Sequence, residues 1–224
     1  LVPIGDEILF NEYESCLNLG GIANISFKKN KNRIAFDICA VNIVINFLAE
    51  KLGLAMDEDG NIAGKGRVNE KLFKQLNNDP FYSLKDKKSI GREWVEEKVL
   101  SVLDCARTDN GKSRTDNRKL KTEDLIATFT EHAAFQIASV IKKNQLKNVL
   151  VTGGGAYNRF LVKRIFELSN AEIILPAKEI INFKEAIIFA LLGVLRMNGE
   201  VNALKNVTGA KEDSCGGSVY FSLK

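Results

Sequence analysis

Two glycine-rich turns are the parts of this sequence best suited to binding a charged ligand. In the first, Gly20 and Gly21 stand between two strand-like runs, and Asn24 follows them. Paired glycines can adopt positive φ and let the backbone approach an anion closely, while an asparagine amide can reach a phosphate or a ribose. A tight hairpin turn explains the same residues without a ligand, so this turn alone does not decide between the two interpretations.

The second turn contains three consecutive glycines, Gly153, Gly154 and Gly155, with Asn158 shortly after them. It joins a β-branched run at 148–152 to a helical pattern, so a ligand could lie against bare backbone near a helix N-terminus, where free N–H groups favour anions. The turn lacks both the lysine of a Walker loop and the spacing of a Rossmann turn. Close packing of a strand against a helix is the alternative explanation.

Two carboxylates are candidates for a metal or a polar substrate. We expect Asp37 to end an apolar strand just before a helix, where it could hold Mg²⁺ directly or through water, although a helix N-cap is an equal alternative. Glu185 begins an otherwise apolar helical run, where it either favours the helix dipole or faces a cleft. Cys39 has no recognisable partner, because His132 lies in a helical pattern, and we discount thiol catalysis.

The segment from Lys88 to Glu93 gathers two cations, Lys88 and Arg92, with a hydroxyl and a carboxylate at the start of a predicted helix. Such a cluster could bind a polar ligand such as a sugar, and a capping box with Ser89 as the N-cap is the alternative. The later stretch from Arg107 to Lys121 has almost no apolar side chain. We interpret it as a solvated surface loop rather than a phosphate-binding arm.

The elements that must position these residues change in type along the chain. Early strands and a late βαβα unit predict an α/β protein in which helices cover a mixed sheet. We expect strands at 16–19, 24–28 and 33–38, helices at 41–52, 69–76, 91–103 and 123–143 with Thr122 as an N-cap, and then a strand at 148–152, a helix at 157–168, a strand at 172–175 and a helix at 184–196.

The composition excludes several classes of protein. The 224 residues include one histidine and four cysteines without Cys-x-x-Cys spacing, which argues against a multi-histidine metal site, structural zinc and disulfides. A net charge of +4 with alternating signs does not indicate a nucleic-acid surface. No apolar run reaches the roughly 18 to 20 residues that span a bilayer. We therefore expect a soluble, cytoplasmic protein without nucleic-acid or membrane partners.

Taken in order, the motifs resemble the anhydro-N-acetylmuramic acid kinase family of the actin and sugar-kinase superfamily. The family carries a Gly-Gly-Ile-Ala-Asn turn, an aspartate that opens a helix, a Lys-Ser-x-Gly-Arg-Glu segment, a triple-glycine turn with a downstream asparagine, a Glu-Ala followed by Phe-Ala, and a closing Val-Thr-Gly-Ala. The matching residues are Gly20 to Asn24, Asp37, Lys88 to Glu93, Gly153 to Asn158, Glu185 to Ala190, and Val207 to Ala210.

The resemblance implies an actin-like, ribonuclease H-like C-terminal lobe over residues 1–224, with the N-terminal lobe absent from this chain. It implies ATP-dependent phosphorylation of anhydro-N-acetylmuramic acid with hydrolytic opening of the anhydro ring, giving N-acetylmuramic acid 6-phosphate in peptidoglycan recycling. By the same resemblance, both glycine turns with Asn24 and Asn158 bind ATP, Asp37 positions Mg²⁺, and Glu185 contacts the sugar, as would Lys88 and Arg92. A homodimer is compatible with it.

The chain departs from the family pattern in two places. Where the family reads Asp-Thr-Gly-Pro-Gly-Asn, only Asp37 and Asn42 are kept, and bulkier residues fill the turn. The family's first phosphate loop and its catalytic aspartate lie upstream of a stretch that resembles Leu1-Val2-Pro3. We therefore expect this chain to be inactive alone, and we assign no catalytic base. A non-catalytic nucleotide- or sugar-binding module and another sugar kinase of the superfamily are the alternatives.

Overall fold

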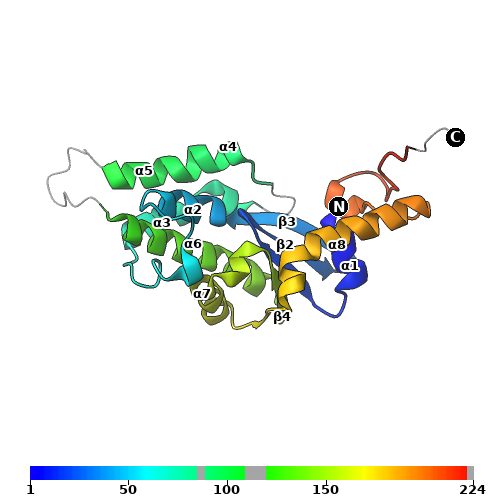
Figure 1. Cartoon of the computed structure of the whole chain (residues 1–224), viewed down its shortest axis with the longest axis horizontal. Helices are drawn as coiled ribbons and strands as arrows, with labels where there is room; N and C mark the ends of the chain where they lie inside the picture. The colour runs from blue at the N-terminus through cyan, green and yellow to red at the C-terminus, as the bar shows by residue number, and fades with distance from the viewer. Residues whose placement is uncertain (85–88, 109–119, 221–224) are drawn as a thin grey trace.

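A five-stranded mixed sheet forms the centre of the molecule. The computed structural model describes residues 1–84, 89–108 and 120–220 (Figure 1). The strands are β1 (Ser15–Leu19), β2 (Ile22–Lys29), β3 (Asn32–Ala40), β4 (Asn148–Thr152) and β5 (Glu172–Ile174), in the spatial order β3-β2-β1-β4-β5. β2 is antiparallel to both of its neighbours, whereas β4 is parallel to β1 and to β5. This is the strand order of a ribonuclease H-like lobe, and the predicted mixed α/β sheet is confirmed.

Side-chain alternation along the strands produces a core on each face of the sheet. Leu17 and Leu19 of β1 join the larger core, whereas Cys16, on the other face of the strand, joins a smaller one. The larger core is covered by α2 (Asn42–Glu50), α3 (Glu70–Asn77), α6 (Thr122–Lys143) and α7 (Arg159–Ser169). The smaller core is covered by α1 (Val2–Leu9) and α8 (Lys178–Met197), which lie side by side (Figure 1).

The remaining elements are short or belong to one broken helix. α4 (Arg92–Trp94), the π-helical η3 (Val95–Leu100) and α5 (Ser101–Thr108) follow one another directly. Together they correspond to the predicted helix over 91–103. The others are η1 (Glu58–Gly60), η2 (Pro80–Ser83), η4 (Gly154–Tyr157) and α9 (Lys205–Thr208). Residues 109–119, which make up most of the predicted surface loop, lie outside the described ranges.

Several predicted boundaries are wrong. The sequence analysis did not predict α1, whose first turn contains Pro3, a residue compatible with a helix start because its missing N–H would have no partner there. α8 begins at Lys178, six residues before the predicted start, because Ile181 continues its buried stripe. Thr122 is the first residue of α6 and not its N-cap, which is Lys121 without a side-chain cap.

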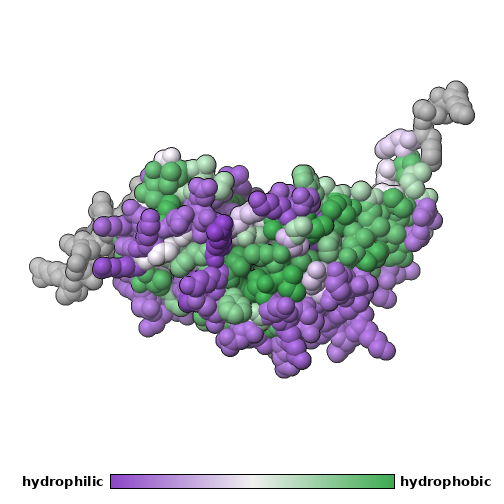
Figure 2. Space-filling model, turned by 60° about the horizontal axis from the view of Figure 1, so that its bottom comes forward, coloured by the Kyte–Doolittle hydropathy of each residue, from purple (hydrophilic) through white to green (hydrophobic). Residues whose placement is uncertain are grey.

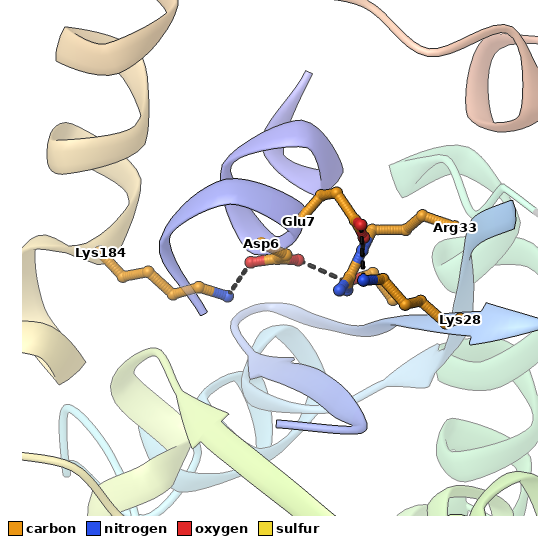
Figure 3. Close-up of polar contacts among 6 residues, drawn as sticks. Asp6, Glu7, Lys28, Arg33 and Lys184 are labelled. Carbon is orange, nitrogen blue, oxygen red and sulfur yellow. Dashed lines mark hydrogen bonds and ion pairs between the residues drawn. The ribbon is translucent and has the colours of Figure 1, made fainter. Parts of the chain in front are cut away.

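A buried ion pair connects α1 to α8 over the smaller core. Asp6 Oδ1 lies 2.6 Å from Lys184 Nζ, and both side chains are more than nine-tenths buried (Figure 3). The geometry is that of a close ion pair without hydrogen-bond alignment. The other carboxylate oxygen of Asp6 accepts a hydrogen bond from Ser26 of β2, whose hydroxyl oxygen in turn accepts one from Arg33 Nη1 of β3 at 3.0 Å. The network therefore fixes both helices to the sheet.

At its outer end the same network reaches solvent through Glu7. Partial burial alone would raise the pKa of Glu7, but hydrogen bonds and charge from Lys28 and Arg33 outweigh it and lower the pKa. Inside the network, burial and the adjacent Asp6 carboxylate raise the pKa of the Cys16 thiol to about 12. Cys16 is therefore protonated at neutral pH and packs as a small apolar group.

We expect Lys184→Met to lower the free energy of unfolding by about 3 kcal/mol, because it leaves the Asp6 carboxylate buried without a countercharge. Urea denaturation followed by circular dichroism measures the change. Lys178→Met, at an exposed position on the same helix, is the matched control and should change stability by less than about 0.5 kcal/mol. A Lys184→Met protein as stable as the control would contradict the role given to the ion pair.

Candidate functional site

Four polar side chains form a row across the sheet at the glycine-rich ends of the strands. Asn18 of β1 pairs in register with Asn24 of β2 and with Thr152 of β4, and Asn24 pairs with Asp37 of β3. Registered neighbours share a face of a sheet, and Asn18 alternates with the core residue Leu19, so this polar row lies on the face that α1 and α8 cover in part. We call these four residues the polar row.

Asp37 lies within β3 and not at its end. The strand continues to Ala40, and Val41 is the N-cap of α2, so the predicted position at the strand end and the alternative N-cap role are both wrong. The physical reason is a β-bulge: Asn24 pairs with Asp37 and Ala23 pairs with Cys39, which extends the strand past the aspartate. Asp37 Oδ2 accepts a hydrogen bond of 2.8 Å from the backbone N–H of Ile90.

The residues around Asp37 fit a magnesium ion of the kind that depends on its substrate for most of its ligands. Asp37 is only partly buried, and Asn24 stands beside it with a second oxygen-bearing side chain. Within the described ranges, no group of three His, Cys, Asp or Glu residues could hold a metal ion. Mg²⁺ commonly takes one or two carboxylates and completes its shell with water and phosphate oxygens, so one carboxylate is chemically sufficient.

The structure brings the two glycine turns together. A Cβ atom placed on Gly155 would lie 2.7 Å from Leu19 Cβ, so the triple-glycine turn packs directly on the residue before Gly20. Asn42, at the start of α2, lies against both turns. Its Nδ2 donates to the Leu19 carbonyl and its backbone N–H to the Gly20 carbonyl, each at 3.3 Å, and the same Nδ2 would be 3.4 Å from a Cβ placed on Gly155. Residues more than 130 positions apart in sequence thus form one site.

The glycines differ in their conformational role. Gly20 and Gly21 do not have the positive φ that their pairing suggested, and they form the short connection between β1 and β2 that the hairpin alternative described. Gly153 does adopt a positive φ of 84°, and a Cβ there would meet Asn18 Oδ1 at 2.4 Å. Gly21 and Gly154 are exposed, so each turn offers bare backbone to a ligand.

Thr152 is a site residue that the sequence analysis missed. Its side chain is 1% exposed, and its Oγ1 has no hydrogen-bond partner in the described part of the chain. An unsatisfied buried hydroxyl costs about 1–3 kcal/mol, so a group held in this state at the end of the polar row is a candidate ligand contact. The available signal was a polar residue that ends an apolar strand directly before glycine. For Asn18 the available signal was a polar residue inside the apolar Cys-Leu-Asn-Leu run.

Other predicted contacts have structural partners or lie away from the row. Asn158 is buried and caps α7, because its Oδ1 accepts from the Leu161 N–H at 2.9 Å. Arg92 is exposed and pairs with Glu96 at 2.8 Å. Lys88 lies outside the described residues. Gly91, not Ser89, is the N-cap of α4, so the proposed capping box is wrong. The roles of these residues toward a ligand stay predictions.

Glu185 lies on the exposed side of α8. Its neighbour Lys184 points into the smaller core, and α8 begins beside the triple-glycine turn, where the Gly153 N–H donates to the Ile181 carbonyl at 3.4 Å. The Tyr157 hydroxyl donates to Asn182 Oδ1 at 2.9 Å and connects the same two segments. Glu185 is therefore one helical turn from the glycine turns, and no described residue forms a hydrogen bond or ion pair with it.

Comparison with known proteins gives matches over almost the whole chain. The sequence profile of the family described as "Anhydro-N-acetylmuramic acid kinase" matches residues 1–222. Proteins of that name from Francisella tularensis subsp. novicida and Haemophilus influenzae are 34% and 32% identical over 99% and 98% of this chain. One from Gamma-proteobacterium EBAC31A08 is 33% identical over 86% of it. The chain covers 59%, 60% and 52% of these three relatives, respectively.

Two solved structures resemble this one only distantly. The activator of 2-hydroxyisocaproyl-CoA dehydratase from Clostridium difficile is 21% identical with a TM-score of 0.44, over 79% of this chain and 58% of its own. Component A of (R)-2-hydroxyglutaryl-CoA dehydratase from Acidaminococcus fermentans is 15% identical with a TM-score of 0.47, over 83% and 63%. Within the described residues, no helix is both long and apolar enough to cross a membrane.

We expect Gly155→Ala to destabilise the fold by about 2 kcal/mol, because the added methyl group would overlap the side chain and carbonyl of Leu19. Gly154→Ala is the matched control: its nearest neighbour, Asn42 Nδ2, would be 3.9 Å from the new Cβ. The control should lose less than about 0.5 kcal/mol. Thermal and urea denaturation compare the two variants, and equal stabilities would show that the turns do not pack as closely as described.

Proposed function

Because the chain belongs to the anhydro-N-acetylmuramic acid kinase family, we propose that it is one lobe of an ATP-dependent kinase acting on anhydro-N-acetylmuramic acid. The observation that carries the proposal is the meeting of the two glycine turns beside the polar row. Exposed glycine backbone, a carboxylate and uncharged polar side chains together suit a nucleotide phosphate chain with its metal ion. The chain spans little more than half the length of its relatives, so the activity belongs to a longer protein.

The proposed reaction joins phosphoryl transfer to opening of the sugar's internal bridge. Water adds to the anomeric carbon, the bond between that carbon and the 6-oxygen breaks, and the 6-oxygen takes the terminal phosphoryl group of ATP. The products are ADP and N-acetylmuramic acid 6-phosphate. Phosphoryl transfer depends mainly on positioning and on neutralising charge, which glycine N–H groups and polar side chains can supply. We assign no catalytic base within these 224 residues.

Each part of the site has a proposed task. Gly21 and Gly154 present backbone to the phosphates, and the Thr152 hydroxyl and Asn18 orient them from the sheet. Asp37, with Asn24 beside it, would hold Mg²⁺, which neutralises phosphate charge when bound. Glu185 would contact the sugar. Cys16 and Cys215 are free thiols, which fits a reducing compartment such as the cytoplasm.

The exposed surface of α8 is suited to contact with a second lobe. Every residue from Ala186 to Leu195 is apolar, so this part of α8 is apolar both on the side that faces the smaller core and on the opposite, exposed side. We call this exposed side the α8 stripe, and Figure 2 shows hydrophobic side chains gathered at the end of the molecule where α8 lies. It consists of Phe183, Ala186, Ile187, Ala190, Val194 and Met197. Phe183, Val194 and Met197 are 58%, 57% and 61% exposed.

A helix that is apolar all round belongs in a protein interior, and an apolar surface of this kind indicates a contact site. We propose that the part of the longer relatives beyond this chain packs on the α8 stripe. The position supports this choice, because Glu185 borders the stripe and the glycine turns lie beside the start of the same helix. A second lobe seated there would close over the proposed substrate contact.

Titration calorimetry with ATP and Mg²⁺ tests the nucleotide site on the 224-residue chain. We expect Thr152→Val to weaken ATP binding about fivefold, because the hydroxyl would lose its contact with the nucleotide, a typical loss of about 1 kcal/mol. Thr130→Val is the matched control, since Thr130 Oγ1 is also buried without a described partner but lies in α6. A wild-type chain that does not bind ATP, or two variants that bind it equally, would count against the site.

The activity is tested on the whole protein that contains this chain. With ATP and anhydro-N-acetylmuramic acid, we expect mass spectrometry to detect N-acetylmuramic acid 6-phosphate. Val194→Asp should reduce product formation at least tenfold there, because a charge in the lobe contact weakens closure, while the isolated chain keeps its stability within about 0.5 kcal/mol.

The exposed Lys178→Gln, on another side of α8 from the stripe, is the control for this substitution and should leave turnover unchanged. Nucleotide or sugar binding without phosphorylated product would instead indicate a non-catalytic binding module. Product formation that is insensitive to Val194→Asp would leave the kinase assignment intact and overturn the docking of a second lobe on α8.

A further inference from the structure

A small cavity opens on the other side of β3 from Asp37. It lies between β3, the C-terminal half of α6 and the end of η2, and its volume is about 190 Å³. The apolar part of its wall comes from Phe36, Ile38, Leu84 and Val140, and Ser139 and Asn144 add polar groups. Phe36 and Ile38 flank Asp37 in the chain but pack with the larger core, whereas Asp37 belongs to the polar row on the opposite face. The cavity is thus separate from the polar row.

A chain of hydrogen bonds fixes the polar floor of this cavity. Tyr82 and Gln136 line the floor, and behind them lie His132 and Asn77. His132 is fully buried, and burial lowers its pKa to about 3, so the ring is neutral and carries one N–H. Asn77 Oδ1 can only accept, at 2.8 Å from His132 Nδ1, so that nitrogen carries the proton. Nε2 then accepts from the Tyr82 hydroxyl at 3.0 Å.

The floor therefore presents acceptors to the cavity. The Tyr82 proton is committed to His132, which leaves the lone pairs of its oxygen. Gln136 is 7% exposed, and its Nε2 donates one of its two N–H groups to Asn77 Oδ1 at 2.7 Å, so its amide oxygen and its second N–H remain for a ligand. A bound molecule should accordingly carry a hydroxyl or N–H donor at the end that reaches the floor.

The rim of the cavity has the opposite character. Lys29 and Lys143 line it and are exposed, and neither forms an ion pair with any described residue. Among the described residues that line the cavity, none has an acidic side chain. Two lysines at the mouth favour an anionic group there.

We propose that this cavity binds a small organic carboxylate with a single apolar ring and a hydrogen-bond donor at the end opposite the carboxylate. The apolar walls enclose the ring, the floor accepts the donor's hydrogen bond, and the lysines meet the charge. The volume lies below the roughly 300 Å³ at which drug-sized sites begin, so a nucleotide or a disaccharide does not fit. The inference does not rest on the proposed kinase activity.

The probe for this site is 4-hydroxybenzoate, whose phenol and carboxylate stand at opposite ends of one ring. We expect saturation-transfer NMR and calorimetry on the 224-residue chain to show one site of submillimolar to millimolar affinity. Benzoate, which lacks the donor, and 4-hydroxybenzyl alcohol, which lacks the carboxylate, should each bind at least fivefold more weakly. Equal binding of all three compounds, or binding of none, would overturn the proposal.

Matched variants place the probe in the cavity. Lys29→Gln and Lys143→Gln should each weaken 4-hydroxybenzoate binding about threefold, and the double variant about tenfold. Lys142→Gln is the control, because Lys142 is exposed on the same helix turn but does not line the cavity. Val140→Phe, which fills the cavity, should abolish binding while circular dichroism shows a folded chain. Binding that is unchanged in the double lysine variant would refute the site, whatever the folding of Val140→Phe.

Discussion

The parallel pairing of β1 with β4 is the constraint on which the candidate site depends. It sets Asn18 opposite Thr152 and so places the turns that follow both strands at one edge of the sheet. Parallel strands need a long crossover connection. Here that connection contains α2 to α6, and these helices also cover the larger core. A shift of this register by one residue would turn Thr152 to the other face and separate it from the polar row.

The smaller core lies on the same face of the sheet as the polar row. Its apolar contacts are few, and the Asp6–Lys184 pair, with Ser26, gives α1 and α8 a fixed position that those contacts alone specify weakly. A buried ion pair contributes little net stability compared with apolar packing, but removing one partner is costly. The pair therefore favours one relative position of α1 and α8 over others. The consequence is that Glu185 and the α8 stripe are held in one orientation relative to the glycine turns.

Local patterns predicted the elements whose apolar residues recur at strand or helix spacing. The early strands and the segment β4-α7-β5 have such patterns, and their boundaries agree with the structure within a few residues. α8 is apolar on all sides from Ala186 to Leu195 but begins with the charged residues Lys178 and Glu179, so a single apolar repeat did not mark its start, and α1 offers only eight residues with a proline at the second position. Asp37 was misplaced because a β-bulge adds a residue without leaving any mark in the alternation of polar and apolar side chains.

The sequence by itself determined the α/β class, the two glycine turns and the family, because these depend on residue types at short spacing. Tertiary structure alone decided that the turns meet, that Asn42 lies against both of them, and that Thr152 closes a row of polar side chains with its hydroxyl unsatisfied. It also showed that Asn158 caps α7. The physical reason is that strand register and these hydrogen bonds form between segments more than a hundred residues apart. A local sequence pattern does not specify which distant segment an element will contact.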